Sequence, residues 1–513
     1  MKPKVTTGQG KTIRLSPEDN VMVTLNELTP DSIILEADIN SHARIPAGHK
    51  VAICRIKSGG QIIKYGQIIG FASKNILPGE HVHTHNAAVS SFRRDYAIGD
   101  DARPTSIQSQ KDQATFKGIL RPNGQVATRN YIGILATVSC STSVAHFIAN
   151  AVEKDSSARY TQVDGILALG HGSGCCDAEG GEGLELLQRA LAGYAGNPNF
   201  GGILLVGLGC EVNHLDCLLE NMHLEEGPLL RTVSIQDSGG TPQAVSRGIK
   251  AVQEMLPEVN RVTRSTVSAS HIVLGLECGG SDGYSGISAN PALGKAVDIL
   301  VASGGTAILS ETPEIYGAEH LLTRRAVSQK VGKKLIDRIR WWQDYTKRHN
   351  ATINNNPSPG NKAGGLTTIL EKSLGAVAKG GSTNLIDVYG YAEAVKSKGL
   401  VFMDTPGYDV VSVTGMIAGG ANIICFTTGR GSVCGFKPVP TLKLATHTEM
   451  YRRMRDDMDV NCGLIIDGKA GIEEMGETIF DLMLDTASGK KSKSETFGFG
   501  DNEFVPWHIG AVL

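Results

Sequence analysis

Apolar and polar residues follow two different patterns along this chain of 513 residues. From residue 12 to residue 90, short apolar runs such as VMVTL and SIILEADI are separated by turn sequences such as KSGGQ and LPGE. No long helical periodicity occurs there, and short runs bounded by turn residues are typical of β-strands. The pattern predicts a small β-rich domain over residues 1–95.

A second pattern begins after a polar, non-periodic stretch at 96–115, which we interpret as a linker. From Phe116, strand-like apolar runs alternate with helical segments such as GEGLELLQRALAGY. This alternation is typical of βαβ units and predicts parallel sheets in two α/β domains, over 116–258 and 265–513.

Four cysteines follow strand-like runs directly or within a few residues: Cys140, Cys175, Cys210 and Cys278. Because the carboxyl ends of parallel strands meet at one crevice, we expect the four thiols to face one pocket. Thiolates together with imidazole or carboxylate groups suit iron or zinc, and the neighbouring His171, Glu211 and Glu277 are candidate partners or acid–base groups. The alternative is that these cysteines are small apolar residues that fill strand ends.

Two later strand-like runs end in the acids Glu311 and Glu314 and in Arg430. An arginine between glycines is suited to binding a carboxylate through two hydrogen bonds, although a structural salt bridge is the alternative. The loop SPGNKAGGLTT contributes Lys362, and KSLGAVAKGG follows it with Lys372 and Lys379. Lysines and backbone N–H groups of this kind suit a carboxylate or phosphate, unless the loop is only a flexible surface segment.

Three histidines, His81, His83 and His85, alternate within GEHVHTHN. On a strand they project from one face, so they are candidates for binding a metal or a substrate carboxylate. A solvated surface position is the alternative for any one of them.

Composition narrows the classes of function. Charges nearly cancel, with 50 Lys+Arg against 52 Asp+Glu, and no basic stripe occurs, so we expect no nucleic-acid partner. No apolar stretch reaches about 18 residues and the N-terminus lacks a signal-like apolar core, so we expect a cytoplasmic protein without a membrane partner. Cysteines there stay reduced, and we assign six of the ten to core or neutral positions: Cys54, Cys176, Cys217, Cys425, Cys434 and Cys462.

Taken together, several long motifs resemble the altronate and galactarate dehydratase family. They are RNYIGILATVSC, GLGCE, GLECGGSDGYSGISANP, PEIYGAEHLL, NPSPGNKAGG and TTGRG, preceded by GHKVA, IIKYGQIIG and GEHVHTHN of a SAF-like N-terminal domain. The resemblance covers nearly the whole chain. It implies a hydro-lyase that converts a sugar acid to a 2-keto-3-deoxy acid. The strings GLECGGSD, PEIYGAE and HVHTHN favour D-altronate over galactarate as the substrate, whereas the C-terminal DNEFVPWHIGAVL departs from the altronate type. Related sulfolactate sulfo-lyases, which cleave a carbon–sulfur bond, carry the same two modules as separate chains.

The resemblance also implies roles for the candidate residues. We expect Fe²⁺, or Mn²⁺, to be held by a subset of the four cysteines; an iron–sulfur cluster with three cysteine ligands and one open iron is the alternative. The catalytic set implied is His171, Glu211, Glu277, Lys362 and Arg430, and the substrate-binding set is His81, His83, His85, Asp282, Asn361 and Thr428. We expect a homo-oligomer. A sugar-acid-binding protein without catalysis, which uses the histidines and Lys64, is a further alternative.

Overall fold

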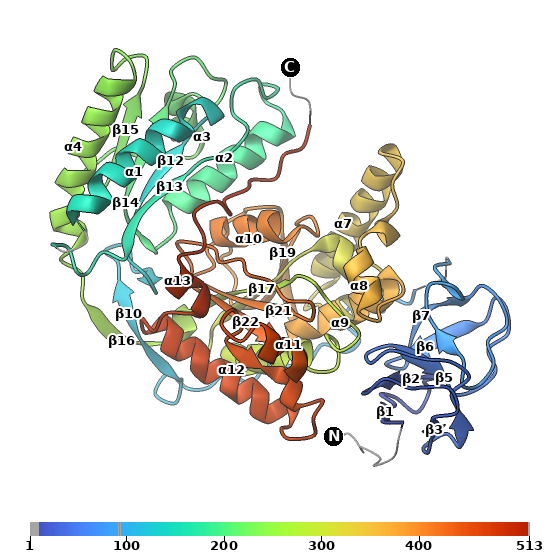
Figure 1. Cartoon of the computed structure of the whole chain (residues 1–513). Helices are drawn as coiled ribbons and strands as arrows, with labels where there is room; N and C mark the ends of the chain where they lie inside the picture. The colour runs from blue at the N-terminus through green and yellow to red at the C-terminus, as the bar shows by residue number, and fades with distance from the viewer. Residues whose placement is uncertain (1–9, 91, 93, 157–158, 511–513) are drawn as a thin grey trace.

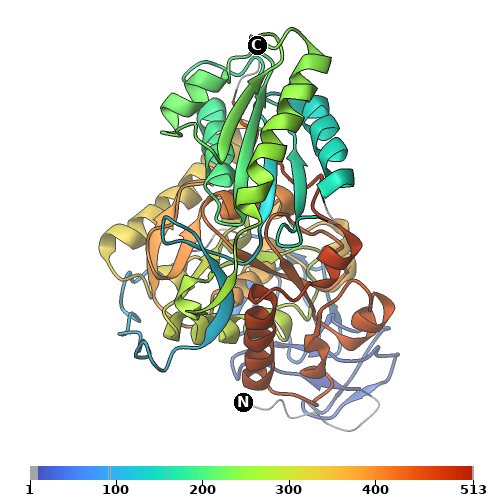
Figure 2. The ribbon, with the colours of Figure 1, turned by 90° about the vertical axis from the view of Figure 1, so that its left-hand side faces the viewer.

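The computed structural model of the chain describes residues 10–510 except 91, 93, 157 and 158. Its elements form a small N-terminal β domain, a second domain with one parallel sheet, and a C-terminal domain with a larger parallel sheet. Figures 1 and 2 show the second domain and the N-terminal domain at opposite ends of the C-terminal domain. The predicted fold class, a β-rich domain followed by parallel-sheet α/β domains, is confirmed.

The N-terminal domain consists of short antiparallel strands that pair in the orders β1-β2-β5-β8, β6-β7-β9 and β3-β4. Tight turns set these short lengths; at Gly79, for example, φ is +83° and a Cβ would lie 2.0 Å from the Asn40 carbonyl oxygen. The strands are β1 Thr12–Ile13, β2 Val21–Thr24, β3 Ile33–Ile34, β4 Ile39–Asn40, β5 Lys50–Ala52, β6 Gln61–Lys64, β7 Gln67–Ala72, β8 His81–Val82 and β9 Ala87–Ala88.

The second domain is built on a four-stranded parallel sheet of order β13-β12-β14-β15. Every residue of β12 is buried, as expected for a strand whose two faces are both covered by helices. The elements are β12 Tyr131–Ala136, η1 Ser139–Ser141, α1 Thr142–Ser156, β13 Gly165–Leu169, α2 Glu182–Ala195, β14 Phe200–Gly207, α3 Leu215–Asn221, β15 Leu230–Ser234 and α4 Thr241–Val259.

A small antiparallel sheet marks the boundary of the second domain. Strand β10 (Thr115–Leu120) pairs with β11 (Val126–Ala127) on one side and with β16 (Arg264–Ser268) on the other. The β10–β16 pairing brings the two ends of the second domain together, so this domain is inserted between two paired strands.

The C-terminal domain contains a seven-stranded parallel sheet of order β19-β20-β18-β17-β21-β22-β23. Strand β17 lies between β18 and β21, so the strand order reverses at β17, and the carboxyl end of such a strand is where open α/β sheets bind ligands. The strands are β17 Val273–Cys278, β18 Thr306–Leu309, β19 Leu385–Tyr389, β20 Gly399–Met403, β21 Ile423–Thr428, β22 Thr441–Ala445 and β23 Val460–Asn461.

Helices cover both faces of the seven-stranded sheet. On one face, helices α5 and α12 pack into an apolar core with β17. On the other face, α10 packs into a second apolar core, which also contains α2 of the second domain. The helices are α5 Ala289–Ala302, α6 His320–Thr323, α7 Gln329–Arg348, α8 Pro359–Ala363, α9 Ile369–Val377, α10 Asp409–Ala418, α11 Thr448–Arg453, α12 Ile472–Ala487 and α13 Lys493–Phe497, with the 3-10 turns η2 Ala269–His271, η3 Thr312–Ile315, η4 Ile353–Asn355, η5 Ala378–Gly380 and η6 Cys462–Leu464.

Two segments tie the domains together. After α13 the chain returns to the second domain, as the red segment in Figure 1 shows. There the ring centroid of Phe504 lies 6.1 Å from that of His171. The beginning of the predicted linker lies on the C-terminal domain, because Asp101 forms a 2.6 Å ion pair with Arg324 of that domain. At least the first part of residues 96–115 is therefore packed on the C-terminal domain.

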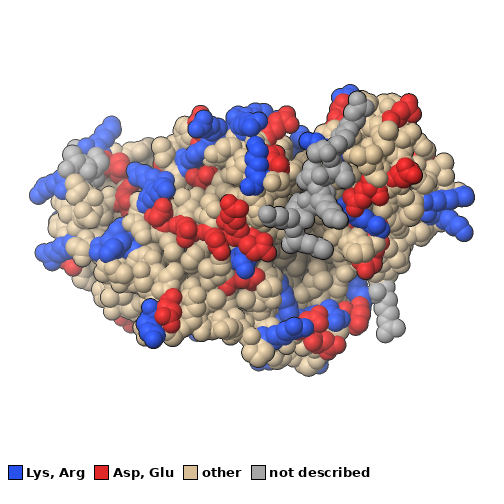
Figure 3. Space-filling model, turned by 90° about the horizontal axis from the view of Figure 1, so that it is seen from below, with Lys and Arg blue, Asp and Glu red and all other residues tan. Residues whose placement is uncertain are grey.

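The charged side chains on the face seen in Figure 3 are mixed in sign, with acidic and basic groups interspersed. This distribution agrees with the near balance of charges in the sequence. In the described part of the chain, no helix combines the length and the apolar character needed to cross a bilayer.

Candidate functional site

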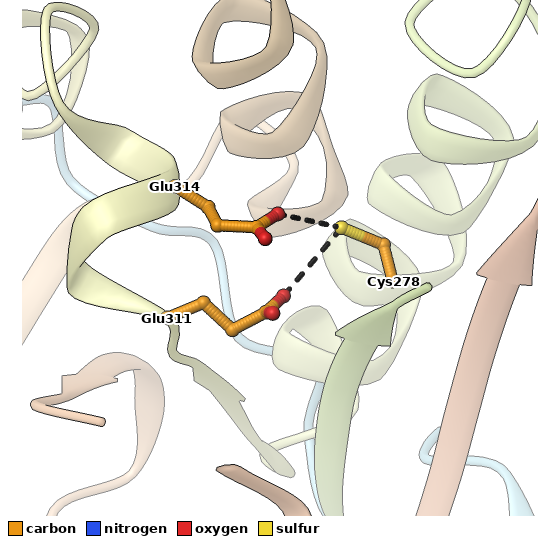
Figure 4. A group of neighbouring side chains, drawn as sticks. All are labelled: Cys278, Glu311 and Glu314. Atoms are coloured by element: carbon orange, nitrogen blue, oxygen red, sulfur yellow. Dashed lines mark hydrogen bonds between the residues drawn. The ribbon is translucent and has the colours of Figure 1, made fainter. Parts of the chain in front are cut away.

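The carboxyl ends of β17 and β18 bring a thiol and two carboxyl groups together. Cys278 is the last residue of β17, and Glu311 and Glu314 follow β18 in the turn that forms η3. The Cys278 Sγ lies 3.5 Å from Glu311 Oε2 and 3.6 Å from Glu314 Oε2, as Figure 4 shows. The three residues are no more than 2% exposed. They lie at the reversal of strand order, where the topology predicts a ligand.

Further carboxyl groups extend this cluster. Two groups of three side chains each place their possible ligand atoms within 4.8 Å of one another. They are Cys278, Glu311 and Glu314, and Glu277, Glu311 and Asp409. Glu277 Oε2 and Glu311 Oε1 are buried without a hydrogen-bond partner. Buried carboxylate oxygens without partners are costly, and a bound cation would satisfy them. The donor set of one thiol and several carboxylates therefore fits a divalent metal.

Two buried lysines neutralise part of the cluster's charge. Lys372 Nζ lies 2.6 Å from Glu314 Oε1, and Lys379 Nζ lies 3.2 Å from Glu311 Oε2. Burial alone would lower the pKa of Lys379, but the neighbouring Cys278 and Glu311 raise it above its ordinary value. Both lysines are thus held as cations beside the carboxyl groups.

Burial shifts the acids of the cluster toward their neutral forms. Burial, followed by the nearby Glu311, raises the pKa of the Glu277 carboxyl well above its usual range. Burial also raises the pKa of the Cys278 thiol, and it raises that of Asp409 to about 7 together with Glu311 and Glu314. Low dielectric and like charges have this effect on any acid, and such shifts concentrate at functional sites.

The backbone around the cluster is specialised. Glu311 adopts a left-handed conformation with φ of 66°, which is uncommon for a residue other than glycine, and its N–H donates to Thr405 Oγ1 at 2.9 Å. At Gly279, directly after Cys278, a Cβ would lie 2.1 Å from Asp409 Oδ2. A glycine is thus required for Asp409 to approach β17. Strained or glycine-dependent backbone of this kind is characteristic of functional sites.

Several residues predicted to bind substrate lie beside this cluster. The backbone N–H of Arg430 donates to the Gly280 carbonyl at 2.8 Å, two residues beyond Cys278. Arg430 is exposed, and no carboxylate in the described part of the chain lies within ion-pair distance of its guanidinium. The guanidinium is therefore not used in a salt bridge of the fold.

The other three predicted binding residues on this edge are largely occupied by local contacts. Asp282 is buried and accepts from Thr446 Oγ1 at 3.0 Å, and Asn361 Nδ2 donates to the Ser281 carbonyl at 2.9 Å. Thr428 Oγ1 accepts from the Gly431 N–H at 3.0 Å. These contacts shape the loops that surround Arg430.

The predicted histidine face of the N-terminal domain contacts the loop that carries Lys362. His83 Nε2 lies 2.8 Å from the Lys362 carbonyl oxygen, and His49 Nε2 lies 3.3 Å from that of Ala363. His49 Nδ1 is also 3.0 Å from His81 Nε2. Burial lowers the pKa of His49 to about 4 and that of His81 to about 3, so these imidazoles are neutral at pH 7. His85 is exposed at the edge of the group, where its ring centroid lies 5.4 Å from that of His81.

A buried ion triad adds to this interdomain contact. Lys50 and Lys64 of the N-terminal domain lie 2.9 and 3.0 Å from the two carboxylate oxygens of Glu371, on α9. Lys64, an alternative sugar-acid ligand in the sequence analysis, is thus occupied in holding the two domains together.

The expectation that all four strand-end cysteines face one pocket is wrong. Cys140, Cys175 and Cys210 follow β12, β13 and β14 of the second domain and are exposed, whereas Cys278 is buried in the C-terminal domain. The sequence pattern predicts the strand ends, but the strands belong to two different sheets. Each sheet gathers its own set of ends.

His171 and Glu211 also lie in the second domain, apart from the Cys278 cluster. His171 Nε2 lies 3.0 Å from the Ala136 carbonyl oxygen, and burial lowers its pKa to about 4. Glu211 accepts from the N–H groups of Leu208 and Gly209 at 3.0 and 2.6 Å; these bonds lower its pKa although burial would raise it. Both residues therefore support the loops of the second domain.

Three residues that the structure brings to these contacts carry no distinctive sequence signal: Asp409, His49 and Glu371. Asp409 follows β20 at a distance of several residues, and no glycine-rich motif surrounds it. His49 is a single histidine, outside the alternating group. The sequence predicts Glu311 and Glu314 as strand-end acids and Lys372 and Lys379 as loop lysines, but no pattern in it shows that the four residues meet.

Comparison with known protein families gives matches along nearly the whole chain. Residues 10–90 match the altronate/galactarate dehydratase SAF domain, residues 118–260 the second domain of D-galactarate dehydratase/altronate hydrolase, and residues 269–512 the C-terminal domain of D-galactarate/altronate dehydratase.

Individual relatives show the same similarity. The chain is 34% identical to the altronate dehydratase of Bacillus subtilis, over 98% of this chain and 99% of the relative. It is 35% identical to the L-threo-forming galactarate dehydratase of Escherichia coli, over 93% of each chain. The beta subunit of a (2R)-sulfolactate sulfo-lyase from Chromohalobacter salexigens is 29% identical over 76% of this chain and 96% of the relative.

Proposed function

Because the chain belongs to the D-galactarate/altronate dehydratase family and is a hydro-lyase, we propose that it removes water from D-altronate with the help of a divalent metal in the Cys278 cluster. The product is then a 2-keto-3-deoxy sugar acid. Galactarate is the second substrate to consider, because the galactarate dehydratase relative is as similar in sequence as the altronate dehydratases.

The buried group of Cys278, Glu311 and Glu314 carries this proposal. Its thiol and two carboxylates come from the strand ends at which the topology predicts a ligand, and Glu311 Oε1 is buried without a hydrogen-bond partner, which a bound cation would satisfy. A mixed sulfur and oxygen donor set suits Fe²⁺, with Mn²⁺ as the second choice. When bound, the ion supplies Lewis acidity that polarises a substrate oxygen and stabilises developing negative charge.

The residues around the cluster match the demands of dehydration. The C2–H bond must break and the C3 hydroxyl must leave as water, which gives an enol that tautomerises to the 2-keto acid. Lys372 and Lys379 are buried cations beside Glu314 and Glu311, and their charge opposes the build-up of negative charge on an enediolate. Glu277 Oε2 has no hydrogen-bond partner and is the oxygen that we assign to proton transfer.

Arg430 and Lys362 are assigned to orienting the substrate. The guanidinium of Arg430 is exposed beside the Cys278–Gly280 segment, and its forked N–H groups match a carboxylate. The loop of Lys362 is held in place by His83 of the N-terminal domain through the 2.8 Å contact to its carbonyl. The N-terminal domain thus has a positioning role.

Anaerobic metal removal and replacement test this function. Chelator-treated protein is loaded separately with Fe²⁺, Mn²⁺ or Mg²⁺ and assayed for 2-keto-3-deoxy acid from D-altronate, galactarate and sulfolactate. We expect turnover of D-altronate that is highest with Fe²⁺. Full activity after chelation would exclude the metal mechanism, and stoichiometric binding of sugar acid without product would show a binding protein.

Variants connect the metal to the assigned residues. Glu314→Gln should lose bound metal and more than about a hundredfold in kcat, because even groups outside the ligand shell contribute about 10- to 100-fold. The matched control is Glu477→Gln, since Glu477 is an exposed carboxylate of the same domain. Retained metal and turnover in Glu314→Gln would move the metal site elsewhere.

A further inference from the structure

The second domain gathers four thiols at one edge of its sheet. Cys140, Cys175 and Cys210 follow the three adjacent strands β12, β13 and β14, and Cys176 follows Cys175. All four are exposed. Cysteine is among the residues most often buried, so a group of exposed thiols at a strand-order reversal requires a cause other than packing.

Backbone contacts hold the loops that carry these thiols against one another. The Ser139 N–H donates to the Ser173 carbonyl at 3.1 Å, and the Val212 N–H donates to the Cys175 carbonyl at 3.2 Å. Gly174 fits this arrangement, because a Cβ there would lie 2.4 Å from the Thr137 carbonyl oxygen. The three loops thus form one structure rather than three independent surface turns.

A buried polar network also holds these three loops in place. Asn213 is fully buried; its Nδ2 donates to the Thr137 carbonyl at 2.8 Å and its N–H to the Gly174 carbonyl at 3.0 Å. Thr137 Oγ1 in turn donates to Glu211 Oε1 at 2.9 Å. These hydrogen bonds hold the loops through backbone and side-chain groups other than the thiols.

The thiols are carried on loops that contact one another, yet no three of them lie close enough together to bind a single ion. In the described part of the chain, ligand groups of three within 4.8 Å of one another occur only around Cys278 and Glu277. A polynuclear cluster holds its thiolates farther apart than one ion does.

We propose that Cys140, Cys175 and Cys210 bind an iron–sulfur cluster in the second domain, separate from the metal site of Cys278. Three thiolates leave one iron of a four-iron cluster without a protein thiolate and open toward solvent. Gln236 Nε2, 3.3 Å from Cys210 Sγ, donates to the thiolate sulfur, a contact that tunes such clusters. This site goes beyond the proposed dehydration and does not depend on it.

Chemical analysis of the full chain tests the cluster directly. Protein isolated without oxygen, or reconstituted with Fe²⁺ and sulfide, should contain acid-labile sulfide, about four per chain for a four-iron cluster, and show sulfide-to-iron charge-transfer absorption. Cys140→Ser, Cys175→Ser and Cys210→Ser should each lose the sulfide and the absorption. Cys217→Ser is the matched control, because Cys217 is an exposed thiol of the same domain that lies on α3.

Thiol labelling of the unmodified protein gives a second measurement that does not require variants to fold. The three ligands should resist alkylation in the reconstituted protein and react after the cluster is removed, whereas Cys54 and Cys217 should react in both states. Absence of sulfide after reconstitution, binding of zinc in its place, or unprotected thiols would overturn the proposal.

The cluster of the second domain and the metal site of Cys278 can be tested separately. Cys278→Ser should keep the sulfide of the second domain while it loses the metal of the C-terminal domain. Loss of sulfide in Cys278→Ser, in a protein that stays folded, would show that the sites are one. Retained sulfide with no dehydration of any sugar acid would contradict the proposed function and leave the cluster in place.

Discussion

At the scale of single residues, burial and neighbours decide what each ionisable group does. Lys379 and Glu311 form a pair that is no more than 1% exposed, whereas Arg430, on the same edge of the sheet, is exposed and has no ionic partner in the described part of the chain. Buried, paired charges such as those of Lys379 and Glu311 stabilise the fold and the cluster. An unpaired arginine beside a cluster of this kind is available for a ligand.

Replacing Arg430 by lysine should therefore affect the substrate and not the fold. Arg430→Lys keeps the charge but loses the fork, which costs about 1.5–3 kcal/mol, or roughly ten- to hundredfold in kcat/KM for acid substrates. Melting temperature and metal content should stay at the values of the unmodified protein. Steady-state kinetics with D-altronate and galactarate check this, with the exposed Arg453→Lys as control. An unchanged kcat/KM would place the substrate carboxylate elsewhere.

At the scale of elements, strand β5, strand β6 and helix α9 hold the N-terminal domain on the C-terminal domain. Lys50 and Lys64 come from the two strands, Glu371 comes from the helix, and the three side chains are no more than 1% exposed. Breaking a buried pair by removal of one partner leaves an unpaired charge, which is far more costly than the loss of an exposed pair.

Glu371→Gln should therefore release the N-terminal domain. It leaves two buried lysines without a counter-charge and should cost about 3–5 kcal/mol. We expect a lower melting temperature and faster amide hydrogen exchange in β5, β6 and α9. The control is Asp387→Asn, which removes the partially exposed pair with Lys334. Equal stability of the two variants would show that the triad adds little to docking.

The neutral histidines make the contact between the N-terminal and C-terminal domains sensitive to acid. Burial lowers the pKa of His49 to about 4 and that of His81 to about 3, from an ordinary value of 6.5. Between pH 6.5 and 4 the undocked or unfolded state binds more protons than the docked state, so stability falls as the pH falls through this window. Above pH 6.5 the histidines contribute no pH dependence. Melting temperatures from pH 8 to 4 check this, and His81→Gln should flatten the slope; an unaltered slope would assign it to other groups.

At the scale of the whole molecule, the chain connects its domains by packing rather than by flexible tethers. Helix α2 of the second domain shares an apolar core with α10, and the C-terminal segment returns across the second domain to Phe504. The N-terminal domain is held by the ion triad and by the histidine contacts to the Lys362 loop. Only the part of the linker around residues 103–112 is both irregular and largely exposed.

Limited proteolysis should reflect this arrangement. Cleavage is expected within 103–112, because exposed irregular segments are the usual sites of nicking. The two fragments should nevertheless co-elute from a sizing column at pH 7, and the nicked protein should keep its activity. Separation should require denaturant or the Glu371→Gln change. Spontaneous dissociation of the nicked protein would mean that the linker, and not the interface, holds the domain.

The sequence by itself determined the local elements and the residue types at their ends. The period-two and βα patterns specified a small β domain and parallel-sheet domains. Three motifs identified strand-end groups: Cys278 in GLECGGSD, the acids after β18 in TAILSETPE, and Arg430 in TTGRG. Both were possible because backbone periodicity and glycine preference are local properties of the chain. Only the tertiary structure decided which ends meet. It separated Cys278 from Cys140, Cys175 and Cys210 and placed His171 and Glu211 in loop support. It also brought Asp409 to the cluster and turned His83 toward a backbone carbonyl. Strand order and domain docking depend on contacts between residues far apart in the chain, so no local pattern encodes them.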